Sequence, residues 1–171
     1  MKIIKRLNII ILLLFIFLLS SASFSEDDPF LLTSKKAWKL SIGETIDNLY
    51  LAYGKKNTKL TDLFLEGTFS PAVEIYINTP VKLNPSLIAE ISFNKNLIIS
   101  RITVLDPKFK YKDQIGIGSK IEELKKIFPN LKIESGEGKT YAVVNEIEAS
   151  FEIDTSNGLS ERSKIKSVLL Y

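Results

Sequence analysis

The protein has 171 residues, with 23 lysines and arginines, 20 aspartates and glutamates and a formal net charge of +3 at pH 7. It contains no cysteine and no histidine. The chain by itself therefore excludes disulfides, cysteine-anchored lipoproteins, Ser-His-Asp and Cys-His catalysis, haem, and zinc sites built from His and Cys.

The first 25 residues have the layout of a secretory signal peptide. Three basic residues lie within positions 1–6, an apolar run covers 7–19, and small residues follow at 20–23. The apolar run has 13 residues, whereas a helix that spans a bilayer needs about 20. We therefore expect a bacterial protein that is periplasmic or secreted, cleaved after Ala22 or Ser25, with no stable membrane insertion afterwards.

Removal of residues 1–25 changes the charge balance. This segment holds three bases and no acid, so the remaining 146 residues carry 20 of each. A neutral chain gives no electrostatic reason to expect a nucleic-acid partner. We expect residues 26–37 to be a leader of undetermined order and residues 38–171 to be a single domain, which has enough residues for its own core.

The domain contains an internal repeat. Ile42–Leu49 parallels Ile117–Leu124, because each has Ile-Gly, a polar pair and then apolar residues at helical spacing. The pattern predicts two helices of about three turns, one ending at Gly54 and the other before Pro129.

The start of the second predicted helix contains a possible cap. Ser119 and Glu122 have the S-x-x-E spacing of a capping box, in which each side chain satisfies a backbone N–H of the first turn. Ser119 followed by Lys120 also has the composition of a Ser-Lys dyad, but adjacent helical side chains point in different directions. We therefore assign Ser119 as the helix cap.

Strand-like patterns follow each predicted helix. The expected strands lie near residues 72–78, 87–94, 98–105, 131–134, 140–144, 147–154 and 164–170. The odd positions of 147–153 are apolar and the even positions are polar, which predicts a sheet with one dry and one wet face. Residues 55–71 contain Gly and Pro breakers, and we expect a mobile loop there.

These elements together predict an α+β fold. We expect two helix-plus-antiparallel-meander repeats, 38–106 and 112–171, because a single helix with about three strands is too small to bury the helix well. Side by side, the repeats are expected to form one antiparallel sheet with the helices packed on one face.

Each repeat begins with the same pattern of Gly, polar pair, apolar residues, acid, Leu and breaker. A strand with a Ser-Phe pair follows, Ser92-Phe93 in the first repeat and Ser150-Phe151 in the second. Each repeat finishes with a further strand, at 99–104 and at 165–170. This pattern resembles the outer-membrane assembly lipoproteins of the SmpA/OmlA type and the β-lactamase-inhibitor-protein domains. The resemblance covers residues 40–171 in two units. It implies a tandem helix-plus-sheet fold that binds another envelope protein, and it implies no catalytic residues. The chain differs in lacking the lipid-anchoring cysteine of the first family and the disulfides of the second.

Three segments carry residue types that are used in binding sites. Ser135–Thr140 contains the Gly-Lys-Thr of a phosphate loop, but Ile133 stands where that loop needs Gly, so we expect a hairpin turn. Asp154–Gly158 is similar in composition to a calcium loop and is predicted to be a turn. Lys108–Lys112 alternates bases with aromatic residues, a pattern that suits an anionic polymer, but we expect a linker whose aromatic side chains pack against the sheet.

A row of acids follows the predicted strand at 147–154. Carboxylates in a row are ligands for a hard cation, and a pair of them can perform acid-base chemistry. Strand alternation predicts the same row as an ordinary solvent face, which is the interpretation that we adopt. The acids of the row are Glu146, Glu148, Glu152 and Asp154.

The sequence therefore predicts an exported, non-catalytic module that binds another envelope or extracellular polypeptide, through the wet sheet face or residues 55–71. One alternative is a periplasmic carrier or sensor of a small apolar ligand, which requires a closed apolar cavity. Another is a carboxylate-based glycan hydrolase, which requires two acids at one cleft. We expect no catalytic, cofactor-binding or metal-binding residue and no cofactor.

Overall fold

The computed structural model describes residues 30–65, 67–78, 83–92, 96–112, 114–136 and 138–171. The expected signal peptide, with both cleavage sites, lies outside the described residues. Within the described ranges, no helix has the length and apolar character needed to cross a membrane.

The described residues form two sheets and two α-helices, which confirms the α+β class. The large sheet contains β4 (Thr58–Leu65), β5 (Thr68–Ile75), β6 (Leu87–Ile91), β7 (Ile99–Val104), β10 (Lys132–Gly136), β11 (Lys139–Val144), β12 (Ala149–Ile153) and β13 (Ile165–Leu170). The small sheet contains β1 (Leu31–Thr33), β2 (Lys36–Ala37), β3 (Leu40–Ser41), β8 (Lys110–Tyr111) and β9 (Ile115–Gly116). The helices are α2 (Ile46–Tyr53) and α3 (Ile121–Ile127), with short 3-10 turns η1 (Lys55–Asn57) and η2 (Asn145–Ile147).

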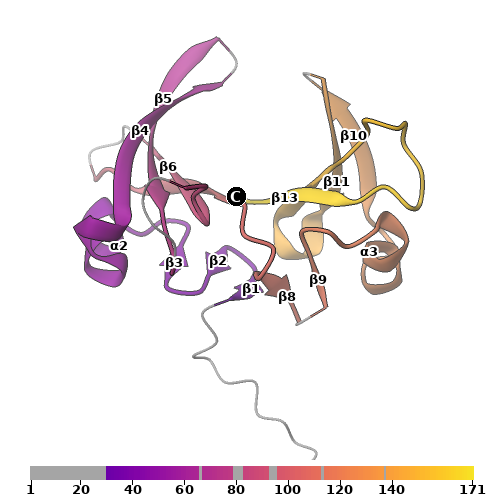
Figure 1. Ribbon diagram of the computed structural model, residues 1–171, viewed down its shortest axis with the longest axis horizontal. Coiled ribbons are helices and arrows are strands. Elements are labelled where there is room, and N and C mark those ends of the chain that lie inside the picture. Colours follow the sequence, from indigo (N-terminus) through magenta and orange to yellow (C-terminus); the bar gives the residue numbers. More distant parts are fainter. Residues whose placement is uncertain (1–29, 66, 79–82, 93–95, 113, 137) are drawn as a thin grey trace, which may run out of the picture.

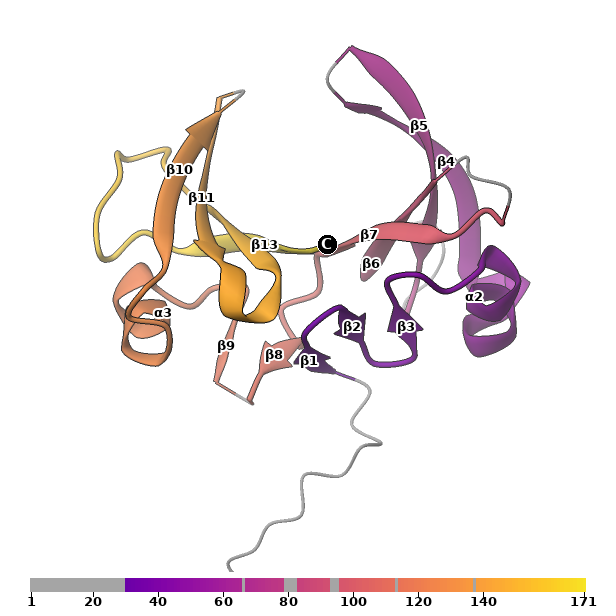
Figure 2. The ribbon, with the colours of Figure 1, turned by 180° about the vertical axis from the view of Figure 1, so that it is seen from behind.

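The large sheet is antiparallel throughout, with the order β10-β11-β12-β13-β7-β6-β5-β4. Strands β7 and β13 pair at its centre, where Ile102 lies opposite Leu170. The hairpins β4–β5 and β10–β11 rise at its two ends, so the sheet is curved like a U (Figure 1). Both helices and the small sheet lie on its outer side, as the reverse view also shows (Figure 2).

The outer face of the large sheet forms the hydrophobic core. Cross-strand pairing places one apolar row on this face: Val73, Ala89, Ile102, Leu170, Ala149 and Val144. Leu49 of α2 and Leu124 of α3 are completely buried against the same cluster. Because one cluster includes residues from both ends of the sheet, the two helices share a single core.

Both helices are shorter than the sequence predicts, with eight residues in α2 and seven in α3. The predicted capping box at Ser119 and Glu122 is wrong. The N-cap of α3 is Lys120, whose backbone N–H donates to Oε2 of Glu123 at 2.8 Å. Ser119 instead accepts from the N–H of Gly116 at 3.3 Å. The helix begins later because the backbone of Ser119 is bonded to Ile165.

Each helix is preceded by the same set of backbone hydrogen bonds. Gly43 donates to the carbonyl of Ile99 at 2.8 Å, and Ile99 donates back to Glu44 at 2.8 Å. Gly118 donates to Ile165 at 2.9 Å, and Ile165 donates back to the next residue, Ser119, at 2.9 Å. The two glycines have φ of 88° and 87°, a region that favours glycine.

The prediction of a loop at residues 55–71 is wrong. These residues form η1, all of β4 and the first part of β5, and the two strands pair from Thr58 opposite Ile75 to Leu65 opposite Thr68. Pro71 lies within β5, opposite Asp62. No described side chain of residues 58–71 is fully buried, whereas the end of β5 joins the core, so the segment 58–71 lacks the alternation that marks a half-buried strand.

The small sheet joins the start of the described chain to the middle of the sequence. Strand β1 pairs in parallel with β8 and antiparallel with β2. Residues 31–37, which belong to the expected leader, therefore supply β1 and β2, and the side chains of Leu32 and Ala37 are buried. This sheet places a second layer under the centre of the large one (Figure 1).

Candidate functional site

The inner face of the large sheet, opposite the helices, contains an open hollow with a volume of about 580 Å³. We call it the sheet hollow. Its lining comes from β4, β7, β10, β11, β12 and β13 and consists of Phe64, Arg101, Glu134, Ser135, Gly136, Lys139, Tyr141, Val143, Ser150 and Leu169. Polar, aromatic and aliphatic side chains thus meet at one site.

The curvature of the sheet creates this hollow. Strands β4 and β10 are the two edge strands, at opposite ends of the strand order. Phe64 of β4 and Glu134 of β10 nevertheless line the same hollow. A flat sheet of eight strands would hold its edges about 30 Å apart, from the strand spacing of roughly 4.8 Å. The hollow therefore exists only because the two hairpins rise on the same side.

Charged groups on the inner face are arranged in two levels. Three carboxylates lie low on the sheet, with 11–18% of their side chains exposed, and the cations paired with them expose 40–57%. The pairs are Lys59 with Glu74 at 3.2 Å, Arg101 with Glu90 at 3.5 Å, and Lys139 and Lys166 with Glu152 at 3.4 and 3.6 Å. Within these pairs the cations are consequently the outer charges.

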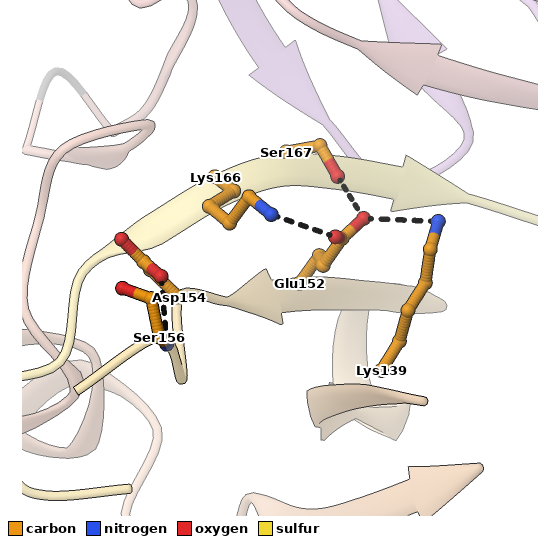
Figure 3. Close-up of polar contacts among 6 residues, drawn as sticks. All are labelled: Lys139, Glu152, Asp154, Ser156, Lys166 and Ser167. Carbon is orange, nitrogen blue, oxygen red and sulfur yellow. Dashed lines mark hydrogen bonds and ion pairs between the residues drawn. The ribbon is translucent and has the colours of Figure 1, made fainter. Parts of the chain in front are cut away.

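Glu152 has the densest set of contacts (Figure 3). Its Oε2 atom accepts from the hydroxyl of Ser167 at 3.1 Å and from Nζ of Lys139 at 3.4 Å. A register shift follows it, because Glu152 lies opposite Ser167 whereas Ile153 lies opposite Ile165. Burial lowers the pKa of Lys139, but the charges of Glu152 and Tyr141 and the hydrogen bonds to them together outweigh burial and raise that pKa above its ordinary value.

The other two carboxylates differ in their partners. Glu90 is buried, and burial raises the pKa of its carboxyl although the charge of Arg101 opposes the shift. Glu74 accepts from the hydroxyl of Tyr76 at 2.7 Å in addition to pairing with Lys59. Burial, this hydrogen bond and the negative charge of Glu74 raise the pKa of Tyr76 to about 12. Tyr76 therefore remains a neutral donor at physiological pH.

The hairpin β4–β5 exposes an aromatic pair. Phe64 and Phe69 lie opposite each other, with ring centroids 5.0 Å apart, and are 64% and 72% exposed. Leu60 on the same hairpin is 65% exposed. Of these three side chains, Phe64 lines the sheet hollow. An exposed aromatic side chain beside a hollow is typical of protein-binding sites.

The acids of the predicted row lie in different environments. Glu146 is in η2, Glu148 pairs with Lys35 at 2.9 Å, and Glu152 pairs with two lysines. Asp154 accepts from the backbone N–H of Ser156 at 3.1 Å, which closes a turn (Figure 3) and lowers the pKa of its carboxyl. In the part of the chain that the structure describes, no three acidic side chains are grouped to hold a metal ion.

The basic-aromatic segment Lys108–Lys112 packs as a linker. Phe109 is completely buried and meets the ring of Phe30 edge-on at 5.3 Å, while Tyr111 contacts Phe128 at 5.3 Å. The ammonium group of Lys110 donates to the carbonyl of Ile117 at 3.2 Å. The aromatic rings are therefore held by the core, as the sequence predicts.

Two further candidate sites from the sequence have structural roles. Gly136 and Lys139 of the phosphate-loop-like segment pair at the end of the β10–β11 hairpin, which confirms the predicted turn. Ser119 and Lys120 form no dyad, because the hydroxyl of Ser119 contacts Gly116 while Nζ of Lys120 pairs with Glu122 at 3.1 Å. Neither segment contributes a reactive pair.

Sequence reasoning included Phe64 only within the candidate binding segment 55–71 and singled out none of the residues that matter most in the sheet hollow. Phe64, Arg101 and Tyr141 belong to three strands and to no motif. Phe64 is on the edge strand β4 and Tyr141 on β11, next to the opposite edge, so no local spacing connects them. A clue was present in the apolar run from Leu63 to Leu65, which is unusual for a polar loop.

Comparisons with known proteins bear on the fold alone. No protein-family model and no curated protein matches the sequence. Among solved structures, the chain is similar to the uncharacterized protein yfeY from Escherichia coli, with a TM-score of 0.55 and 14% sequence identity. The match covers 82% of this chain and 96% of that chain. A similarity at this level of identity concerns the arrangement of elements and carries no function.

Proposed function

We propose that this protein is an exported, non-catalytic module that binds another polypeptide of the bacterial envelope or the extracellular space through the sheet hollow. The observation that carries the proposal is that exposed Phe64 of the edge strand β4 lines one open hollow together with the cations Arg101 of β7 and Lys139 of β11. Aromatic residues and arginine dominate the binding energy of protein interfaces. The signal-peptide pattern of residues 1–25 supports the location.

The contacts of the inner face favour binding over the two alternatives. A carrier of an apolar ligand needs space between helices and sheet, where Leu49, Leu124 and Phe151 are buried in the shared core. A glycan hydrolase needs two facing carboxylates about 5–9.5 Å apart. Glu134 is the one acid among the described residues that line the hollow.

We also infer that residues 38–106 and 112–171 are two repeats of one unit. The matching bonds of Gly43 with Ile99 and of Gly118 with Ile165 support this inference. So does the order of elements, since α2 precedes β4 to β7 and α3 precedes β10 to β13. The resemblance to the SmpA/OmlA and β-lactamase-inhibitor-protein domains stays a prediction.

The proposal is tested by capture from envelope extract with the purified protein, followed by mass spectrometry. The double variant Phe64→Ala/Phe69→Ala removes the exposed aromatic pair, and Leu51→Ala removes an equally exposed apolar side chain from α2 on the outer side. We expect wild type and Leu51→Ala to enrich the same polypeptide and the double variant to lose it.

Both phenylalanines lie outside the core, so we expect the double variant to keep the fold. Circular dichroism checks this. Recovery of no enriched polypeptide by the wild-type protein, or equal recovery by the folded double variant, would contradict binding through the sheet hollow.

A further inference from the structure

The charge arrangement of the inner face indicates which chemistry its partner has. A ligand that approaches from solvent meets the ammonium groups of Lys59, Lys139 and Lys166 before it meets the carboxylates below them. Near Glu152 two cations share one acid. A carboxylate of the ligand can pair with the outer cation while the buried acid keeps the second one.

The same hollow also presents apolar surface. Phe64, Tyr141 and Val143 line it beside Lys139, and Phe64 is largely exposed. An aromatic or large aliphatic side chain that enters between them would remove apolar surface on both partners from water. Cationic and apolar side chains thus line the same hollow.

The dimensions of the hollow limit the form of the ligand. Its volume of about 580 Å³ lies within the range of roughly 300–1,000 Å³ in which proteins bind ligands of modest size. The hairpins β4–β5 and β10–β11 rise on either side of it (Figure 1), and its lining includes residues from both of them. A short extended segment fits this space better than the flat surface of a folded domain.

We propose that the sheet hollow binds an extended acidic peptide segment that carries one aromatic or large aliphatic side chain as its anchor. This inference rests on the proposed function and adds the chemistry of the partner. It requires that binding depend on Lys139 of the lining and less strongly on Lys166, which lies outside the lining and shares Glu152 with Lys139. It also requires that the acid of the lining, Glu134, oppose binding.

The experiment is a selection of randomised 12-residue peptides displayed on phage, with the purified protein as the target. We expect the enriched peptides to contain several Asp or Glu residues next to an aromatic or aliphatic residue. One enriched peptide and its Asn/Gln counterpart are then synthesised with a fluorescent label, and their Kd values are measured by anisotropy. The neutral counterpart should bind at least tenfold more weakly.

Four variants place the acidic peptide in the hollow. Lys139→Gln should raise Kd about three- to tenfold, because it removes an outer cation of the lining. Lys166→Gln should raise Kd less, because Lys166 lies outside the lining and acts only through the shared Glu152. Glu134→Gln should lower Kd, because it removes like charge. Lys126→Gln, an equal change of charge on the exposed side of α3, should leave Kd unchanged.

Each unfavourable outcome has a defined meaning. Enrichment of neutral or basic peptides, or an unchanged Kd for the neutral counterpart, overturns the acidic partner while polypeptide binding stands. If Lys126→Gln raises Kd as much as Lys139→Gln does, the effect is one of general charge, and the assignment of the peptide to the hollow is overturned. Enrichment of no peptide overturns the extended segment, and the proposed function then depends on the separate capture experiment.

Discussion

Glu90 lies on the inner face of the sheet with its carboxyl buried and one cation, Arg101, beside it. Burial raises the pKa of this carboxyl in the folded protein. The folded state therefore holds the Glu90 proton more tightly than the unfolded chain, whose glutamate has a pKa of about 4.3. Stability must fall as pH rises from that unfolded value through the raised folded value.

The variant Glu90→Gln tests this effect, because an amide stays neutral over the whole range. Near pH 3.5 the side chain of residue 90 is neutral in both proteins, and we expect their free energies of unfolding to change with pH in the same way. From there to pH 7 the wild-type protein should lose free energy of unfolding relative to the variant, as measured by urea denaturation at several pH values. Glu146→Gln, at an exposed position of η2, is the control. A difference between wild type and Glu90→Gln that stays constant with pH would contradict the prediction.

Strand β9 shows how one element depends on a missing side chain. Gly116 lies opposite Lys110 of β8, and a Cβ added there would overlap the backbone oxygen of Phe109. Phe109 is completely buried, so this backbone has little room to move. The small sheet therefore needs glycine at this position for space.

We expect Gly116→Ala to lower the free energy of unfolding by at least about 2 kcal/mol, as overpacked sites do. Gly136→Ala on β10 is the matched control, because no heavy atom lies within 4 Å of a Cβ added there, and we expect a change within about 0.5 kcal/mol. Urea denaturation measures both. Equal effects of the two substitutions would mean that the overlap is relieved at no cost.

At the scale of the whole molecule, the described residues share an apolar cluster that extends from α2 to α3 under the large sheet. Ile102 and Leu170 join its two ends at the β7–β13 pair. Such continuity predicts a single cooperative unfolding transition. The protein contains one tryptophan, Trp38, whose ring meets Tyr53 at 5.7 Å, so its fluorescence reports on the α2 end alone.

The substitution Ile165→Val removes one methyl group from a fully buried side chain at the other end of the cluster. The substitution should lower the free energy of unfolding by about 1 kcal/mol and lower Tm by roughly 2–4 °C. We expect Trp38 fluorescence and far-ultraviolet circular dichroism to report the same shift. An unchanged fluorescence transition next to a shifted dichroism transition would show instead that the two ends unfold independently.

The sequence by itself determined the parts that depend on local patterns. Alternation marked the positions of seven strands, and apolar spacing with Gly54 and Pro129 marked both helices. The aromatic residues of Lys108–Lys112 were correctly expected in the core. These features are visible because burial on one face imposes a period on the chain.

Only the tertiary structure decided the rest. Residues 58–71 of the β4–β5 hairpin lie outside the core, so burial left no clear period in their sequence. Helix α3 begins one residue later than predicted because Ser119 is bonded to Ile165. The sheet hollow depends on curvature that brings the edge strands β4 and β10 to one site. Twist and curvature arise from the packing of all strands together, and no short segment encodes them.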